Sequence, residues 1–116
     1  MTRRAYRPVV CTGPGPGADP TPGEESVEVL LDRDTLRVER IVSLDYSSPD
    51  GFWYDQPDDE WVTVLRGRGV LEFEDGNRVE LGPGDWLDIP AHVRHRVAAT
   101  HATEATVWLA VHTPAE

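Results

Sequence analysis

The sequence predicts an all-β domain, either a sandwich or a small barrel of short antiparallel strands. Segments rich in β-branched and aromatic residues recur along the chain, and Gly, Pro, Asp and Asn residues separate them at short intervals. No apolar pattern of helical period extends over a useful length, so no helix is expected. The chain has 116 residues, close to the commonest size of one domain, and it contains no internal repeat.

Nine short strands are expected along the chain. They cover residues 27–31, 36–42, 52–56, 60–65, 70–74, 78–81, 86–89, 95–100 and 106–112. The first two flank the turn Asp32-Arg33-Asp34, and Pro57 ends the third, which is an aromatic segment. Asp75-Gly76 predicts a tight hairpin turn because both residues tolerate a positive φ. Gly82-Pro83-Gly84-Asp85 predicts a second tight turn before the strand that begins at Trp86.

The N-terminal part of the sequence differs in composition from the rest. Residues 12–25 form a tract rich in Pro and Gly that offers few side chains to bury. We therefore expect a flexible arm over residues 1–25 and a folded domain over residues 26–116. A domain of about 90 residues buries only roughly 60–65% of the surface that its unfolded chain exposes, which leaves a small stability margin. Burial against a second copy would increase that margin, so a homodimer is expected.

The charge of the chain disfavours two classes of partner. The formal net charge is −10, from 21 acidic and 11 basic residues, and all the basic residues are arginine. Such an acidic surface repels phosphate backbones, so the sequence predicts no nucleic-acid binding. It also contains no polybasic patch of the kind that binds anionic membranes.

The cysteine content and the apolar runs indicate a cytoplasmic protein. Cys11 is the only cysteine, so no disulfide can form within the chain, and a reducing compartment is expected. Arg3-Arg4 is followed by the short apolar run Val9-Val10-Cys11, where an export signal needs a longer one. No segment reaches the length of a transmembrane span.

Two polar residues are expected on faces of strands that turn toward the core. Residues two apart on a strand share a face, so Glu60 lies with Val62 and Val64, and His95 lies with Val97. A carboxylate on an apolar face is unfavourable unless it is paired, hydrogen-bonded or bound to a metal. Glu60 and His95 are therefore the first candidates for a functional site. Tyr54 and Gln56 share a face by the same rule and precede Glu60 in the chain.

The region around Glu60 resembles the first sequence motif of the cupin superfamily. That motif reads Gly, five residues, His-x-His, three or four residues, Glu, six residues, Gly. Glu60 and Gly67 have its spacing, and Pro57 stands where the motif often carries proline. Tyr54 and Gln56 occupy the two histidine places, and no glycine stands at the leading position.

The region around His95 resembles the second cupin motif, which reads Gly, five residues, Pro-x-Gly, two residues, His, three residues, Asn. Gly84, Pro90 and His95 match it in register, whereas His92 replaces the glycine and Ala99 replaces the asparagine. The resemblance covers residues from about 36 to 112. It implies a small antiparallel β-barrel of the jelly-roll type, and it is much less specific for function because one fold hosts many chemistries.

The resemblance also implies a candidate metal site. Metal-dependent cupins bind one divalent ion through the two histidines and the glutamate of the first motif and the histidine of the second. Carried over by position, Gln56, Glu60 and His95 are the candidate ligands, with Tyr54 at the remaining place. Iron, manganese, nickel or zinc is the implied ion, although tight sites for these ions usually have more imidazole ligands.

An alternative without metal uses the same residues. Tyr54, Gln56, Glu60 and His95 would then form a hydrogen-bond network at the mouth of the barrel, with His95 paired to Glu60. This network would still line a pocket for a small organic molecule. It could transfer protons, with His95 or Glu60 as the general base and Tyr54 as the acid.

Two functions follow from these alternatives. The first is a small-molecule enzyme centred on Glu60 and His95, because the cupins it resembles include oxygenases, isomerases, cyclases and lyases. The second is a non-catalytic module that binds or senses a small ligand, which the loss of both first-motif histidines favours. The remaining histidines are not assigned to the site. His92 is expected in an exposed turn near the mouth, with a place among the polar lining residues as the alternative. His101 is expected in an exposed loop, and His112 ends the last strand and receives no role.

Overall fold

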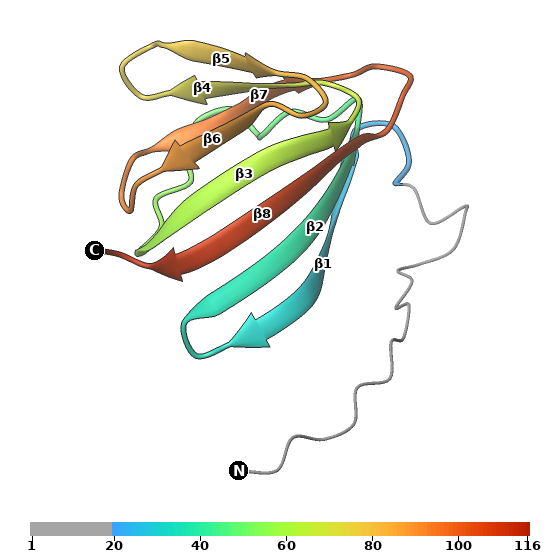
Figure 1. Cartoon of the computed structure of the whole chain (residues 1–116). Coiled ribbons are helices and arrows are strands. Elements are labelled where there is room, and N and C mark those ends of the chain that lie inside the picture. The colour runs from blue at the N-terminus through green and yellow to red at the C-terminus, as the bar shows by residue number, and fades with distance from the viewer. Residues whose placement is uncertain (1–19) are drawn as a thin grey trace, which may run out of the picture.

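The computed structural model describes residues 20–116, which form eight β-strands and no helix. The strands are β1 (Glu24–Arg33), β2 (Leu36–Leu44), β3 (Asp58–Arg66), β4 (Gly69–Phe73), β5 (Arg78–Leu81), β6 (Trp86–Ile89), β7 (His95–Thr100) and β8 (Thr106–Pro114). A five-stranded sheet has the order β1-β2-β8-β3-β6, and a three-stranded sheet has the order β5-β4-β7 (Figure 1). All strand pairs within the sheets are antiparallel. The expected all-β fold of the jelly-roll type is confirmed.

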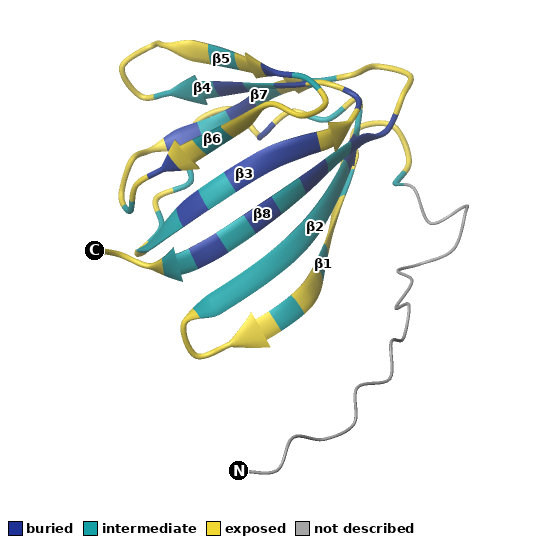
Figure 2. Ribbon diagram, in the orientation of Figure 1, coloured by how far each residue is buried: buried dark blue, intermediate teal, exposed yellow. Residues whose placement is uncertain are grey.

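The core lies between the two sheets and follows the alternation of the sequence. On β3, Val62 and Val64 point inward and are almost fully buried, and on β8 Trp108 and Ala110 do the same. Buried and partly exposed residues alternate along β8 in Figure 2, whereas β3 carries an unbroken buried run at residues 62–64. Leu71 on β4 packs against this cluster from the other sheet. Burial of each large aliphatic side chain contributes about 1.5–3 kcal/mol, so these central strands supply much of the stability.

The position of β8 decides which polar residues meet. β8 lies between β2 and β3 and pairs with both. In this register His112 stands opposite Arg37 on β2 and opposite Glu60 on β3. Directly paired residues project from the same face of a sheet, so these three side chains form one row on the inner face. The sequence places them far apart.

The predicted strand at residues 52–56 is wrong. Only Tyr54 makes a bridge, in which its backbone N–H donates to the His95 carbonyl at 2.7 Å and its carbonyl accepts from the His95 N–H at 3.2 Å. The neighbouring backbone groups bond elsewhere: the Phe52 N–H donates to Pro49, and the Gln56 carbonyl accepts from His92. These contacts belong to turns and loops, so the ladder ends after one residue pair. The other eight predicted strands are present.

The predicted arm at residues 1–25 lies mostly outside the described residues. Its last two residues, Glu24 and Glu25, belong to β1, so the folded part begins slightly earlier than expected. Cys11 lies outside the described residues as well. Within residues 20–116, no helix is long and apolar enough to cross a membrane.

Candidate functional site

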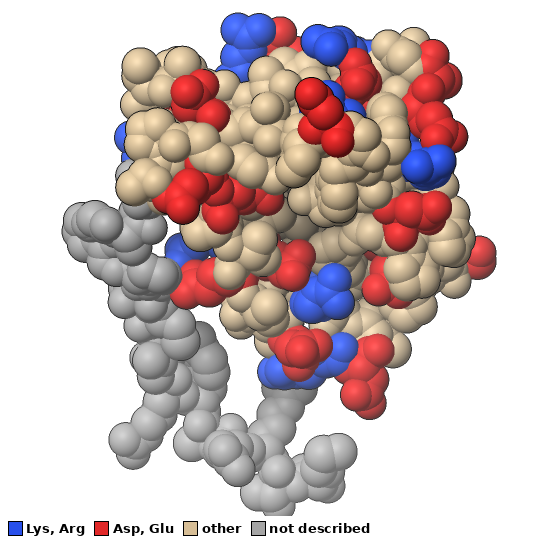
Figure 3. Space-filling view, turned by 180° about the vertical axis from the view of Figure 1, so that it is seen from behind, with Lys and Arg blue, Asp and Glu red and all other residues tan. Residues whose placement is uncertain are grey.

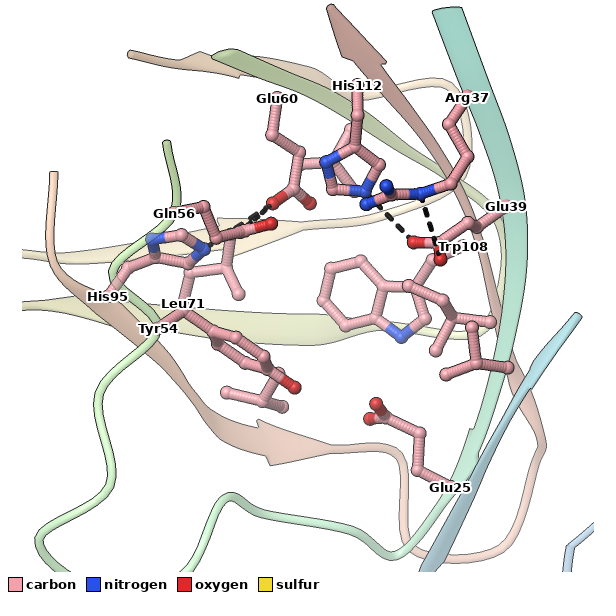
Figure 4. Close-up of a pocket in the computed structure, with 14 residues that line it drawn as sticks. Glu25, Arg37, Glu39, Tyr54, Gln56, Glu60, Leu71, His95, Trp108 and His112 are labelled. Atoms are coloured by element: carbon pink, nitrogen blue, oxygen red, sulfur yellow. Dashed lines mark hydrogen bonds and ion pairs between the residues drawn. The ribbon is translucent and has the colours of Figure 1, made fainter. Parts of the chain in front are cut away.

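A cavity of about 300 Å³ opens between the two sheets, a volume at the lower end of small-molecule pockets. Polar side chains lie at two ends of this cavity and apolar side chains lie between them (Figure 4). The polar residues that line it are Glu25, Arg37, Glu39, Tyr54, Gln56, Glu60, His95 and His112, and the apolar ones are Val27, Ile41, Val62, Leu71, Val97 and Trp108.

His95 begins β7 and is held in one orientation by the backbone. Its side chain is only 5% exposed, and its backbone pairs with Tyr54. The imidazole Nδ1 lies 2.8 Å from the Val93 carbonyl oxygen, which can only accept, so Nδ1 carries a hydrogen. The Tyr54 ring stacks against the imidazole with 5.4 Å between ring centroids. The reactive nitrogen of His95 is therefore Nε2, which faces Glu60.

Glu60 and His95 form a close pair at one end of the cavity. The Glu60 Oε1 atom lies 3.6 Å from His95 Nε2 and accepts a hydrogen bond from Gln56 Nε2 at 2.8 Å. Because Nδ1 of His95 is already a donor, a neutral imidazole would turn its Nε2 lone pair toward the carboxylate. Two electron-rich atoms that face each other repel, so a proton on one of them stabilises the arrangement.

The electrostatics of the pair place that proton on the imidazole. Burial acts to lower the pKa of His95, but the adjacent Glu60 carboxylate and the Val93 carbonyl outweigh it and raise that pKa above its ordinary value. Burial acts to raise the pKa of Glu60, but His95 and Gln56 outweigh it and lower that pKa. Both shifts favour an imidazolium beside a carboxylate, which is a proton donor next to a proton acceptor.

A second polar group lies next to this pair and was missed in the sequence. His112 is 5% exposed and its Nε2 lies 2.9 Å from Glu39 Oε1. Arg37 Nε lies 3.4 Å from Glu39 Oε2, which makes an ion pair at the mouth of the cavity. Among the described residues, Nδ1 of His112 has no hydrogen-bond partner. The only sequence signal for this group was that Arg37 and Glu39 share the inner face of β2 with Ile41.

Glu25 and Tyr54 form the other polar end. Glu25 Oε2 accepts a hydrogen bond from Ser43 Oγ at 3.0 Å, and Ser43 Oγ in turn accepts one from Trp108 Nε1 at 3.2 Å. In Figure 4 the Tyr54 hydroxyl points away from His95 and toward the side of the cavity where Glu25 lies. Burial, and next the charge of Glu25, raise the pKa of the Tyr54 hydroxyl, so that it remains a hydrogen-bond donor.

The four predicted site residues all line one cavity, but they do not present four ligand atoms to one point. Glu60 and His95 approach each other, whereas Gln56 presents its amide nitrogen to Glu60 and the Tyr54 hydroxyl lies at the other end. Among residues 20–116, no group of three or more His, Cys, Asp or Glu side chains is arranged to hold a metal ion. This donor set does not fit a tight transition-metal site, which needs at least three such ligands.

His92 lies outside the cavity. It has a positive φ of 64°, a 68% exposed side chain and a hydrogen-bond contact of 2.7 Å between Nδ1 and Asp55 Oδ1. Its place in an exposed turn was expected from the sequence. His112, for which no role was expected, is instead a buried lining residue of the cavity.

Comparison with known proteins agrees with this fold. The family described as Cupin domain matches residues 45–112, which include all of β3 to β7 and most of β8. None of the curated proteins compared with the chain matches it.

Two solved structures illustrate the similarity. A crystal structure from Ralstonia eutropha JMP134, described as a "putative mannose-6-phosphate isomerase", is 48% identical, covers 85% of this chain and 94% of its own, and has a TM-score of 0.79. A cupin superfamily protein from Desulfitobacterium hafniense DCB-2 is 20% identical over 83% of each chain, with a TM-score of 0.69. The second similarity concerns the fold alone.

Proposed function

The chain belongs to the cupin family, and from this premise we propose that it is a small-molecule isomerase that works by proton transfer. The observation that carries the proposal is the Glu60–His95 pair, whose Oε1 and Nε2 atoms lie 3.6 Å apart on the wall of the cavity. A buried base beside a buried acid is the arrangement that proton transfer at carbon requires. The description of the 48% identical Ralstonia protein as an isomerase also supports it.

The chemistry follows from the charges of the pair. In the interconversion of an aldose and a ketose, the Glu60 carboxylate removes a proton from the carbon next to the carbonyl. His95 gives its Nε2 proton to the carbonyl oxygen, and an enediol results. Glu60 then returns its proton to the former carbonyl carbon, while the neutral imidazole takes the proton of the neighbouring hydroxyl. The substrate and product are isomers, and both protein groups return to their first state.

Neighbouring residues would assist this pair by position. Val93 fixes Nδ1 of His95, so the same nitrogen, Nε2, donates in one half of the reaction and accepts in the other. Gln56 holds Glu60 Oε1 and leaves the second carboxylate oxygen for the substrate. Tyr54 would donate a hydrogen bond from its hydroxyl to a more distant oxygen of the substrate. The proposed steps use no metal, because the donor set around Glu60 supplies only two suitable ligands.

Hydrogen exchange with solvent tests the proposal. The protein is incubated in D₂O with a panel of aldoses and ketoses, free and phosphorylated, and loss of the carbon-bound hydrogen is followed by NMR. The wild type should exchange it with at least one sugar, and Glu60→Gln and His95→Asn should each lower the rate by about 10²–10⁴-fold. The control is Glu80→Gln, which makes the same chemical change on an exposed residue paired to Arg68. Full activity of the Glu60→Gln and His95→Asn variants would refute the assignment.

The second candidate function is a non-catalytic ligand-binding module. It is favoured by the replacement of both first-motif histidines by Tyr54 and Gln56 and by the mutual pairing of Glu60 and His95. Under this function the protein would bind a sugar without any exchange of its hydrogens. Saturable binding together with no exchange for the whole panel would favour it over the isomerase.

A further inference from the structure

We propose that the cavity accepts an uncharged, unphosphorylated sugar and that Glu25, at the end remote from His95, is the residue that rejects phosphorylated ones. This inference rests on the proposed function, since it names the substrate class of the same site. It departs from the phosphorylated sugar in the description of the Ralstonia relative. Three features of the cavity lead to it.

The first feature is that each basic side chain of the cavity already faces a carboxylate. Arg37 and His112 both contact Glu39, at 3.4 and 2.9 Å. His95 faces Glu60 at 3.6 Å. No lysine exists in the chain, and Arg37 is the only arginine among the lining residues. A phosphate group is normally bound by arginine, lysine or several backbone N–H groups, and here it would have to displace an existing carboxylate.

The second feature is that Glu25 has hydrogen-bonding capacity left over. It projects from β1 toward the cavity and faces Ser43, its partner residue on β2. The Ser43 hydroxyl is its only side-chain hydrogen-bond partner among the described residues, and no arginine or histidine of that range lies within ion-pair distance of it. A carboxylate accepts several hydrogen bonds, so this end of the cavity suits the hydroxyl groups of a ligand. A phosphate dianion at the same place would meet a like charge.

The third feature is the surface between the two ends. Ile41, Val62, Leu71 and the indole of Trp108 line it. A sugar has hydroxyl groups around its edge and C–H groups on its faces, so it can lie against this apolar surface with hydroxyls at both ends.

The surroundings of the cavity do not favour anions either. Beside Arg37 the neighbouring hollow is lined by Arg33 but also by Asp32, Asp34 and Asp58. The face seen in Figure 3 is hollowed near its middle, and acidic side chains are spread around the hollow with fewer basic ones. The acidic side chains of this surface therefore repel a phosphorylated ligand but not an uncharged one.

Equilibrium binding of matched sugar pairs tests the inference without any turnover. Isothermal titration would compare D-mannose with D-mannose 6-phosphate and D-fructose with D-fructose 6-phosphate, each at low and at high salt. In the wild type the unphosphorylated member of at least one pair should bind at least about tenfold more tightly, as expected for one like-charge contact. The difference should shrink at high salt, where repulsion is screened.

Two variants assign the effect to Glu25. Glu25→Gln should tighten the binding of the phosphorylated sugar and so reduce the difference in affinity between the two members of a pair. The substitution removes the charge but keeps an oxygen that accepts the hydrogen bond from Ser43. Glu28→Gln is the matched control: it removes the same charge from the same strand, on the outer face where Glu28 pairs with Arg40. Glu28→Gln should leave the difference unchanged.

Several results would overturn the inference: equal or tighter binding of the phosphorylated sugar by the wild type, no binding by either member of any pair, or equal effects of the two variants. The salt dependence of the wild type provides a test that does not depend on the folding of either variant. Failure of the isomerase proposal would appear as binding without hydrogen exchange and would leave the binding preference intact. Exchange confined to phosphorylated sugars would overturn this inference and leave the isomerase standing.

Discussion

Trp108 forms the floor of the cavity, and the substitution Gly69→Ala tests how firmly it is held. Gly69 begins β4, in the sheet opposite Trp108. A Cβ atom added at this position would lie 2.1 Å from Cη2 and 2.2 Å from Cζ2 of the indole, far inside contact distance. The indole is 3% exposed, and its Nε1 donates to the Ser43 hydroxyl, so it has little room to move away.

The expected loss of stability is about 2–4 kcal/mol. Overpacking by one methyl group in a well-packed core destabilises by about 1–3 kcal/mol. If the indole shifts to relieve the clash, its hydrogen bond to Ser43 is lost as well, which adds about 1 kcal/mol. A domain of this size has a total stability of only about 5–15 kcal/mol, so this loss is readily measured.

Urea denaturation followed by circular dichroism at 25 °C gives the comparison with the wild type. The matched control is Gly82→Ala, where the added Cβ would lie 3.7 Å from Asp85 Oδ2, an ordinary contact. This control should change the free energy of unfolding by no more than about 1 kcal/mol. A loss below about 1 kcal/mol for Gly69→Ala would mean that the indole moves freely and that the packing described for the floor of the cavity is wrong.

Three further outcomes are expected. Burial raises the pKa of Glu25 above its ordinary value of 4.5, so the folded state holds this proton more tightly than the unfolded chain and loses stability as pH rises through the raised pKa. The Glu25→Gln variant should therefore have a higher free energy of unfolding than the wild type at neutral pH and an equal one below pH 4.5, as measured by urea denaturation. A difference in the free energy of unfolding that stays constant at all pH values would contradict this expectation. Thr106→Val should lower the free energy of unfolding by about 2–3 kcal/mol in the same assay, because the buried Thr106 hydroxyl accepts a hydrogen bond from the Arg68 N–H and donates one to the Arg68 carbonyl. A loss under about 0.5 kcal/mol would contradict this prediction. Treatment with EDTA should leave unchanged both the melting temperature and the rate at which the carbon-bound hydrogen of the sugar exchanges with solvent. Elemental analysis gives the refuting outcome: a stoichiometric content of iron, manganese, nickel or zinc in the wild type that disappears in His95→Ala would show that the site holds a metal.

Local patterns in the sequence predicted most of the strands and one half of the cavity wall. Alternation placed Glu60 on the face of Val62 and Val64, and the structure shows these residues on the inner face of β3. The spacing of the two motifs brought Glu60 and His95 together although 35 positions separate them in the chain. Tyr54 was expected on the same cavity, which is correct, even though the strand expected to carry it is absent.

The other half of the cavity wall depends on the order of the strands in the sheet, which cannot be predicted from local patterns in the sequence. Arg37, Glu39 and His112 have the right alternation, but they meet only because β8 lies beside β2. The strand β8 is the last in the sequence and β2 is the second, so nothing nearby in the chain fixes their pairing. Glu25 was assigned to the flexible arm because it ends a Pro- and Gly-rich tract, and its pairing with β2 overrides that composition.

The central position of β8 also has a consequence for the order of folding. Strands β2 and β3 are not neighbours in the sheet, and each reaches the other only through β8. As a chain is synthesised from its N-terminus, β1 to β7 leave the ribosome before β8 does. The row formed by Arg37, His112 and Glu60 therefore closes only after β8 has been synthesised. Pairing over such long separations is slow, so we expect the cavity to form late and together with the rate-limiting step of folding.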